Sequence, residues 1–493
     1  MRDRAQLDAK SLAVLHHLES YVNGDEQADA SIVSDYIRFI GMDHAVVAGP
    51  GDILSSAVLT SFVPLLSRIL NCDLYADIYV QLLTAMLEQL SFGNVTKYFS
   101  EENVMEALNS SQYAVVYMAI HVVKVNLSRG DVEVAKFLVK FPALQSLTKR
   151  LLDSVDVPTR IVSDTEECIR IFAGLEHFNI AGWEFIEDVH KSSAMNDASL
   201  LGRYLSVIQS LALKISSETA RLLSDFDMTK ILNEDPETAD PFLASMLIAF
   251  YSFMLTKVPF YLIQKPVDQC VQDFAKRRQE DRFDFIVDPT LMDLLSRASL
   301  ASNESQSYLK LEFERIPLLT RFDFSSPEDV RYFCKLDLSV IPRKAEFFDS
   351  NFTSWTFQNL SYAHFRCLIH LIDNEELFAM LVDSAKLEEK VLIKLPHDLL
   401  YEFAERVTRY DYSATQLFRQ PYLVLNQLIV ADPAIVNPEI WELKKQALQN
   451  LLLYRNVDMG AWKQALMSCY KEMLNGRLVK SVEPKVDVTD EAM

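Results

Sequence analysis

The sequence predicts an all-α fold built from stacked pairs of helices. The chain has 493 residues, and its 49% hydrophobic content is enough for a large buried core. Its 11 glycines are few for the tight turns of a sheet-rich fold. Apolar residues recur with helical spacing in segments of about 10 to 18 residues, separated by short polar breaks. A lone helix pair cannot bury both of its apolar faces, so the pairs must stack on one another.

The clearest predicted helix pair lies between Lys394 and Phe418. Pro396 stands where the first turn of a helix tolerates proline. One apolar face then follows, formed by Leu399, Leu400, Phe403, Val407 and Tyr410. We expect a break at Asp411-Tyr412, and Ser413 followed by Gln416 has the form of a capping box that begins a second helix. Two helices joined this tightly must lie antiparallel.

The chain before this hairpin follows the same pattern. A first helix pair flanks the turn at Asn23-Gly24-Asp25, and Ser100 with Asn103 marks another helix start. His44 to Asp52 is expected to be a plain connector, because the chain has no Gly-Lys dipeptide of a phosphate-binding loop. Equivalent pairs recur about every 40 residues, which is the spacing of HEAT and armadillo units and gives about eleven units.

We expect a single HEAT-repeat solenoid over residues 1–476. Its rhythm is irregular between residues 279 and 362, although Ser326-Pro327-Glu328-Asp329 begins a helix well within that region. Asn437-Pro438-Glu439 begins a further helix with an apolar stripe. Residues 477–493 alternate charges with isolated valines and are expected to form a disordered tail.

No segment predicts a membrane span or a secretory leader. The longest uncharged run, Pro241 to Thr256, holds 16 residues, whereas a transmembrane helix needs about 20, so we expect a buried helix. The N-terminus is charged from its second residue. The six cysteines contain no CxxC pair and are expected to be reduced. We therefore expect a cytoplasmic protein that can also enter the nucleus.

The formal net charge of −21 disfavours nucleic-acid binding, which normally needs a basic patch. The one basic cluster is Lys276-Arg277-Arg278, and Glu280 and Asp281 follow it closely. We interpret this cluster as a solvated helix end or loop. An acidic surface suits a basic protein partner.

The common sequence motifs of enzymes are absent: there is no HExxH, GxSxG, GxxxxGK or CxxC. His364, Cys367 and His370 would not share one helix face, so they make a poor metal site. Acidic pairs such as Glu166-Glu167 with Asp164 suit a surface for a basic partner better than they suit acid/base catalysis. We predict a protein that is not an enzyme and has no cofactor.

Trp355 with Asn359 forms a single W-x-x-x-N. Nuclear import adaptors of the armadillo type repeat this feature along an inner groove. No ladder of such pairs occurs here, which removes the main support for an import adaptor.

The C-terminal block resembles a known family. The residues that carry the resemblance are Leu395-Pro396, Thr408-Arg409-Tyr410-Asp411-Tyr412, Ala447-Leu448-Gln449-Asn450-Leu451-Leu452, Trp462 and Asn475-Gly476. They are similar to the end of the HEAT-repeat chaperones that assemble the base of the proteasome regulatory particle. The fungal member carries a mismatch-repair name, and its animal relative is called proteasome non-ATPase regulatory subunit 5. A shorter similarity runs from Tyr98 to Leu108.

The resemblance implies a right-handed superhelix of HEAT/armadillo-like pairs, bent into a C-shaped solenoid. It implies a chaperone that holds the C-terminal domain of a proteasomal ATPase subunit in its concave face. A second ATPase subunit and a large non-ATPase scaffold subunit would join, and the chaperone would leave before the proteasome matures. The free protein is expected to be a monomer.

The resemblance block itself predicts structure more than binding. Tyr410, Leu451 and Trp462 fall on apolar faces, where large residues usually pack in the core. Arg409 and Asp411 could pair with each other or cap a helix end. Pro396 and Tyr412 complete this structural set.

Contact residues for a partner are predicted from polar positions on the expected inner helices. They are Asp164, Glu167, Arg203 and Tyr204. The alternative function is a generic HEAT or armadillo scaffold or transport adaptor. An enzyme with an unrecognised helical site is the third hypothesis. A direct role in DNA repair agrees poorly with the charge.

Overall fold

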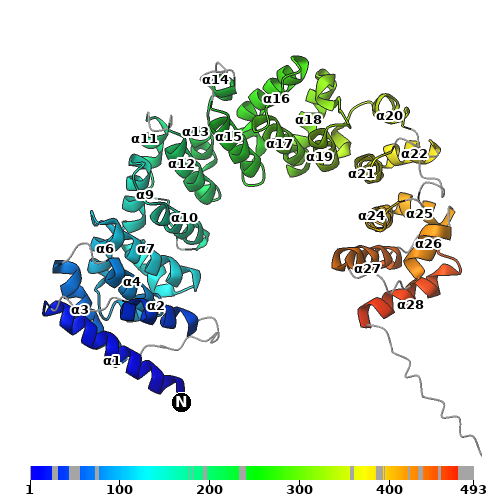
Figure 1. The fold of residues 1–493 in the computed structure, drawn as a ribbon. Coiled ribbons are helices and arrows are strands. Elements are labelled where there is room, and N and C mark those ends of the chain that lie inside the picture. The colour runs from blue at the N-terminus through cyan, green and yellow to red at the C-terminus, as the bar shows by residue number, and fades with distance from the viewer. Residues whose placement is uncertain are drawn as a thin grey trace, which may run out of the picture. The chain divides into compact units, whose positions relative to one another are not determined.

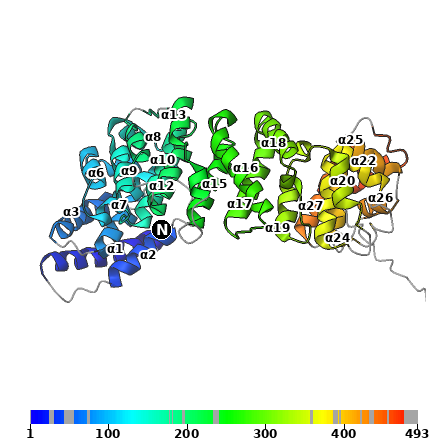
Figure 2. The same ribbon diagram turned by 90° about the horizontal axis from the view of Figure 1, so that it is seen from above.

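A computed structural model describes residues 2–24, 31–43, 56–72, 77–176, 178–180, 182–192, 197–232, 240–355, 360–384, 392, 395–419, 422–430, 437–453 and 457–475. The described secondary structure is entirely helical, which confirms the predicted all-α fold. The chain divides into two compact units, Met1–Val267 and Asp268–Met493. In each unit the helices lie side by side (Figures 1 and 2).

The helices of the first unit are α1 (Arg2–Val22), α2 (Ser31–Asp43), α3 (Ser56–Cys72), α4 (Asp77–Leu87), α5 (Phe92–Val95), α6 (Glu101–Leu108), α7 (Tyr113–Ser128), α8 (Val132–Lys140), α9 (Ala143–Asp153), α10 (Thr159–Gly174), α11 (Phe185–His190), α12 (Ala198–Leu211), α13 (Ser217–Leu223), α14 (Met228–Leu232), α15 (Pro241–Met254) and the 3₁₀ turn η2 (Phe260–Leu262). Helix α16 (Gln264–Gln279) begins in the first unit and ends in the second.

The remaining helices of the second unit are α17 (Val287–Ala301), α18 (Asn303–Arg315), η3 (Pro317–Thr320), α19 (Pro327–Lys335), η4 (Leu338–Val340), α20 (Lys344–Phe352), α21 (Tyr362–His370), η6 (Leu371–Asp373), α22 (Glu375–Asp383), α24 (His397–Val407), α25 (Asp411–Arg419), α26 (Tyr422–Ile429), α27 (Pro438–Leu453) and α28 (Trp462–Asn475). None of the described helices is both long enough and apolar enough to cross a lipid bilayer.

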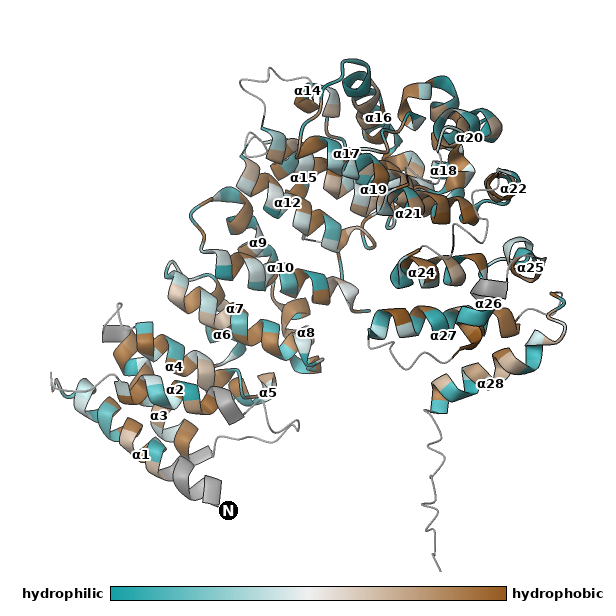
Figure 3. Cartoon of the chain, turned by 45° about the vertical axis from the view of Figure 1, so that its right-hand side comes forward, coloured by the Kyte–Doolittle hydropathy of each residue, from teal (hydrophilic) through white to brown (hydrophobic). Residues whose placement is uncertain are grey.

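Each unit contains one continuous row of packed helices. In the first unit α4, α7, α10, α12 and α15 pack in succession, and we call them the α4–α15 row. In the second unit α17, α19, α21, α24 and α27 pack in the same way. The apolar stretches of the helices alternate with hydrophilic ones (Figure 3), as expected for helices that each bury one stripe.

Hydrogen bonds about 40 residues apart connect successive repeats. Arg150 donates to the carbonyl oxygen of Ser110, 40 residues earlier, at 2.6 Å. In the second unit the Tyr412 hydroxyl donates to the carbonyl of Ile372, again 40 residues earlier, at 2.7 Å. The sulfur of Cys469 lies 3.2 Å from the carbonyl of Leu428, at a separation of 41 residues. These contacts agree with the spacing predicted from the sequence.

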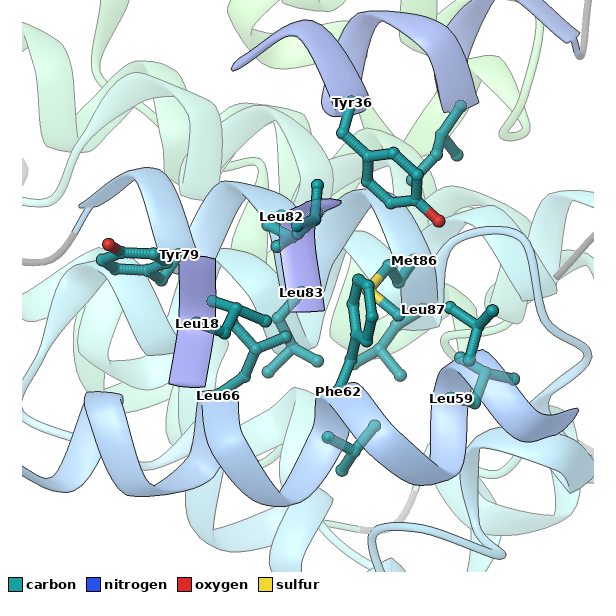
Figure 4. Close-up of a cluster of buried hydrophobic side chains, with 14 of the residues drawn as sticks. Leu18, Tyr36, Leu59, Phe62, Leu66, Tyr79, Leu82, Leu83, Met86 and Leu87 are labelled. Carbon is teal, nitrogen blue, oxygen red and sulfur yellow. The ribbon is translucent and has the colours of Figure 1, made fainter. Parts of the chain in front are cut away.

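The core at the N-terminal end shows how the first helices are held. Leu18, Phe62, Leu66 and Leu83 come from three different elements and are all buried (Figure 4). Burying each of these side chains contributes about 2 kcal/mol to folding. Two polar groups buried beside this core satisfy each other, because His17 Nε2 lies 3.0 Å from the hydroxyl of Tyr79.

Several predicted helix starts are confirmed. Ser100 and Asn103 form a capping box at α6, and Ser326 caps α19 with Pro327 in the first turn. Pro241 begins α15, whose cap is Asp240. Pro438 begins α27 as expected.

The predicted capping box at Ser413 is wrong. Helix α25 already begins at Asp411, and the break falls between Val407 and Asp411. Ser413 is buried inside the helix, and its hydroxyl donates to the carbonyl of Val407 at 2.7 Å. The hydroxyl therefore ties the new helix to the end of α24, and Asp411 occupies the first turn, where a carboxylate suits the helix dipole.

We predicted that the basic cluster at the end of α16 is solvated, and this prediction is wrong for two of its three residues. The side chains of Arg277 and Arg278 are largely buried. Arg277 pairs with Asp273 at 2.5 Å, and Arg278 pairs with Asp329 at 2.5 Å. A nucleic-acid patch would need these cations at the surface, and here two of the three are used inside the protein.

Other predictions concern residues outside the described ranges. These are the connector His44 to Asp52, the W-x-x-x-N partner Asn359, and the tail at residues 477–493. The number of repeats and the single solenoid over residues 1–476 stay predictions.

Candidate partner-binding surface

A polar hollow lies on the α4–α15 row of the first unit. It has a volume of about 450 Å³. Its lining comes from α7, α10 and α12 and from the end of α15: Lys124, Ser163, Asp164, Glu166, Glu167, Arg170, Ser206, Gln209, Ser210 and Phe253. Two of the four predicted contact residues, Asp164 and Glu167, lie in this lining. Such an open polar depression fits a segment of a protein partner better than a small apolar ligand.

Asp164 is held by side chains from the neighbouring helix. Its two oxygens lie 2.8 Å from His121 Nδ1 and 2.7 Å from Lys124 Nζ, and only 7% of the residue is exposed. Burial alone would raise the pKa of Asp164, but the hydrogen bonds from His121 and Lys124 outweigh it, and the net pKa is lowered. Asp164 therefore stays ionised and joins α10 to α7.

His121 stands between two carboxylates. Its Nε2 lies 3.1 Å from Glu88, on the side opposite Asp164. The hydrogen bond to Asp164 and then that to Glu88 raise the pKa of His121 to about 9. The ring is thus a cation at neutral pH, and both of its nitrogens donate.

Glu166 and Glu167 differ in their burial and in the side chains that contact their carboxylates. Arg170 approaches Glu167 with two nitrogens, one of them at 2.7 Å, and this pair lies at the surface. The pKa of Glu167 is lowered mainly by that hydrogen bond. Glu166 is half-buried, and burial raises its pKa, while a hydrogen bond from Ser206 acts in the opposite direction. The lining of the hollow carries three carboxylates, those of Asp164, Glu166 and Glu167, against the two cations Lys124 and Arg170. The charge of Arg203, which is not in the lining, acts to lower the pKa of Glu166.

Arg203 has a structural position. Its guanidinium donates to the carbonyl oxygens of Leu151 at 2.9 Å, Ser154 at 2.6 Å and Val155 at 3.1 Å. These carbonyls lie at and just beyond the end of α9, where backbone acceptors have no partner within the helix. Arg203 closes that helix end, and its two terminal nitrogens donate to backbone carbonyls.

The prediction that Tyr204 contacts a partner is wrong. Its residue exposure is 0%. The hydroxyl donates to the carbonyl of Leu223 at 3.0 Å and lies 3.1 Å from His190 Nδ1. The aromatic ring belongs to the core, because it projects from the opposite side of α12 to the residues that line the hollow.

The resemblance block packs within the second unit. Arg409 pairs with Glu405 at 2.6 Å. The hydroxyl of Tyr410 lies 3.1 Å from Asp373, and the rings of Tyr410 and Tyr412 stack with centroids 5.2 Å apart. Pro396 is the N-terminal cap residue of α24, Leu451 is fully buried and Trp462 is half-buried. The side chains of Tyr410, Tyr412 and Leu451 therefore help to hold the last helices together.

Sequence reasoning missed His121, Lys124, Ser206 and Phe253. Each comes from a different repeat than the acidic residues of α10, so no local motif contains them. The 40-residue spacing could have located Lys124, because it lies 40 residues before Asp164. Among the described residues no group of three or more His, Cys, Asp or Glu side chains could hold a metal ion.

Comparison with known proteins places this chain in a family. The model of the N-terminal domain of DNA mismatch repair protein HSM3 matches residues 12–256, and the model of its C-terminal domain matches residues 261–493. The chain belongs to the HSM3 family. The predicted resemblance is confirmed, and it extends from the C-terminal block over nearly the whole chain.

Two curated HSM3 proteins match along almost their whole length. The protein from Debaryomyces hansenii is 22% identical over 515 residues, covering 99% of each chain. The protein from Candida albicans is 23% identical over 496 residues, covering 98% of this chain and 99% of the relative. Both are named DNA mismatch repair protein HSM3.

A solved structure of importin beta has the same kind of fold. It is 12% identical, with a TM-score of 0.51, and the match covers 92% of this chain and 66% of importin beta. At this identity the likeness concerns the fold alone, a helical solenoid, and it supports the HEAT-like stack predicted from the sequence.

Proposed function

We propose that this HSM3-family protein is an assembly chaperone of the proteasome regulatory-particle base. It holds the C-terminal domain of an ATPase subunit and helps to gather a second ATPase subunit and a large scaffold subunit. It is released before the proteasome matures. Family membership and the helical-solenoid fold support this role.

The observation that carries the binding part of the proposal is the hollow on α7, α10 and α12. Its surface is preformed, because Asp164, His121 and Lys124 fix the helices that line it. Its lining contains three carboxylates and two cations. A basic segment of an ATPase C-terminal domain would complement it, and such complementarity accelerates encounter and selects partners.

Binding of isolated ATPase C-terminal domains by the full chain tests the proposal. We expect one member of a panel of these domains to bind selectively, and the double variant E166K/E167K to weaken that binding at least tenfold. Raising the salt concentration should weaken it further, since the attraction between exposed charges is screened. E106K makes the same kind of charge change at an exposed position on α6 and should leave binding unchanged.

The outcomes separate the two parts of the proposal. If no ATPase domain binds selectively, the chaperone role fails. If one binds and E166K/E167K binds equally well, the chaperone role stands and the hollow is not the contact surface.

The name of the relatives suggests a second role, in DNA repair. The net charge of −21 and the internal pairing of Arg277 and Arg278 argue against direct contact with DNA. We expect no tight, salt-sensitive binding of the purified protein to duplex or mismatched DNA, as measured by fluorescence anisotropy. Such binding would overturn this view.

A further inference from the structure

The sequence contains one short motif twice, and the two copies differ in how far their phenylalanines are exposed. Arg282-Phe283-Asp284-Phe285 joins α16 to α17, and Arg321-Phe322-Asp323-Phe324 precedes α19 one repeat later. We call these segments the first and second RFDF loops. Their offset is 39 residues, which matches the repeat spacing.

Both loops are braced in the same way by α16. In the first loop the backbone N–H of Asp284 donates to Asp288 at 2.7 Å, and Arg277 lies 3.5 Å from that carboxylate. In the second loop the N–H of Asp323 donates to Asp329 at 2.7 Å, and Arg278 pairs with that carboxylate. Two adjacent arginines thus hold two equivalent loops.

The backbone of the first RFDF loop is fixed at both ends. The N–H of Arg282 donates to the carbonyl of Arg277 at 2.9 Å, and Asp284 accepts from the N–H groups of Ile286 and Val287 at 2.8 and 2.9 Å. Asp281 adopts a left-handed conformation with φ of 51°. A loop fixed in this way loses little conformational entropy when it binds another surface.

The phenylalanines of the second loop are packed against other rings. Phe322 lies 5.2 Å from Phe333, and Phe324 lies 5.1 Å from Trp355, measured between ring centroids. Phe322 is only 7% exposed. The second loop therefore shows which kind of surface accommodates the motif: an apolar pocket lined by aromatic rings on a helix pair.

The phenylalanines of the first loop have no such cover in the described residues. Phe283 is 46% exposed and Phe285 is 86% exposed. Their rings contact each other edge to face at 5.3 Å, and no other described aromatic ring packs against either of them. The loop between α16 and α17 thus presents two large apolar side chains to solvent from a rigid support, which is a common property of interaction sites.

The charges around these two rings indicate which charge the edge of the partner's pocket carries. Glu280 and Asp281 are exposed beside them, and Asp284 lies between them, while Arg282 is the one cation within the loop and pairs with Glu280 at 3.2 Å. The loop is therefore negatively charged around its apolar tip. A partner pocket edged with lysine or arginine would complement it.

We propose that the first RFDF loop is an interaction site that inserts Phe283 and Phe285 into an apolar pocket of another folded protein, a pocket lined by aromatic rings and edged with basic residues. This site lies in the second unit and is separate from the hollow on α7, α10 and α12. It does not depend on the identity of the partner bound there.

Photo-crosslinking from the loop tests this proposal in cells. The full chain carries p-benzoylphenylalanine in place of Phe285, and a matched chain carries it in place of Phe242, which is 69% exposed on α15. We expect one discrete adduct from position 285 only. Its crosslinked peptide should come from a different protein and lie in an apolar pocket flanked by lysine or arginine, and the adduct should disappear when F283S is added.

A binding measurement with purified proteins then gives the contribution of the two phenylalanines to the affinity. The crosslinked protein, purified, should bind F283S/F285S at least tenfold more weakly than the unchanged chain, and F242S equally well. The double variant changes only exposed side chains, so its thermal unfolding midpoint should match that of the unchanged chain. No adduct beyond the Phe242 control, an adduct with a second copy of this chain, or unchanged affinity of F283S/F285S would each overturn the proposal.

Discussion

The hollow in the first unit and the hairpin of α24 and α25 in the second use similar residues for different purposes. Both contain acidic, basic and aromatic side chains that come from more than one repeat. In the hairpin the polar groups are joined to one another: Arg409 to Glu405, Tyr410 to Asp373, and Tyr412 to a backbone carbonyl. In the hollow, Glu166 keeps a carboxylate with no ion-pair partner within the described residues and faces a depression of about 450 Å³.

This difference separates residues that identify the family from residues that we propose as the partner surface. The C-terminal block is conspicuous in the sequence because packing and hydrogen bonding restrict so many of its positions. The hollow draws its lining from several repeats, and any one of its residues is ordinary alone. A conspicuous sequence block is therefore a poor guide to the partner surface of a solenoid.

Truncating the centre of the resemblance block should have the largest effect on stability. Leu451 is fully buried between α27 and its neighbours, so L451A should lower the free energy of unfolding by about 3 kcal/mol through lost burial and a cavity. Urea unfolding followed by circular dichroism measures this. L453A removes the same atoms from a side chain that is 69% exposed and serves as the control.

A stability loss of L451A below about 0.5 kcal/mol would contradict a packing role for the block. The same variant should bind its ATPase domain normally at a temperature where it remains folded. A selective loss of binding there would move the partner surface to the block.

Replacing Arg203 should lower the stability of the protein by less than L451A does. R203A leaves the carbonyls at the end of α9 without their charged donor, and we expect the free energy of unfolding to fall by about 2 kcal/mol. R203K keeps a cation but cannot reach several carbonyls at once, so it should recover only part of the loss. If R203A unfolds like the unchanged chain but loses partner binding, Arg203 is a contact residue and not a structural one.

The pH dependence of stability should show the interaction of His121 with Asp164 and Glu88. The pKa of His121 is about 9 in the folded chain, against about 6.5 when unfolded. Its stabilising contribution is therefore complete below pH 6.5 and is lost as the pH rises from 6.5 to 9. We expect a decrease on the order of 1 kcal/mol over this interval.

H121Q should flatten this part of the stability profile, and H16Q, which alters an exposed histidine on α1, should not. The profile is obtained from denaturant midpoints at several pH values. An unchanged slope in H121Q would show that His121 is not charged in the folded chain.

Much of the fold could be predicted because helix periodicity and capping are local. Ser100, Ser326 and Pro241 begin helices where their own neighbours require it. The prediction failed at Ser413, whose hydroxyl donates to a carbonyl of the preceding helix. It also failed at Arg277 and Arg278, which reach Asp288 on α17 and Asp329 on α19. These outcomes depend on tertiary contacts that no local pattern contains.

The candidate site was predicted in part for the same reason. Asp164 and Glu167 are close together in the sequence and could be recognised as an acidic surface. Tyr204 was misplaced because a step of only two residues along α12, to Ser206, turns the side chain by about 200° from the core to the hollow. The two RFDF loops were missed because their flanking sequences do not align.

Hydrogen exchange of the full chain with and without its ATPase C-terminal domain tests the central claim most directly. We predict slower exchange on binding at residues 163–170 and 206–210, which line the hollow, and no change at residues 405–413 of the resemblance block. Protection at residues 405–413 without protection at the hollow would contradict the claim that the family block supports the structure while the hollow binds the partner.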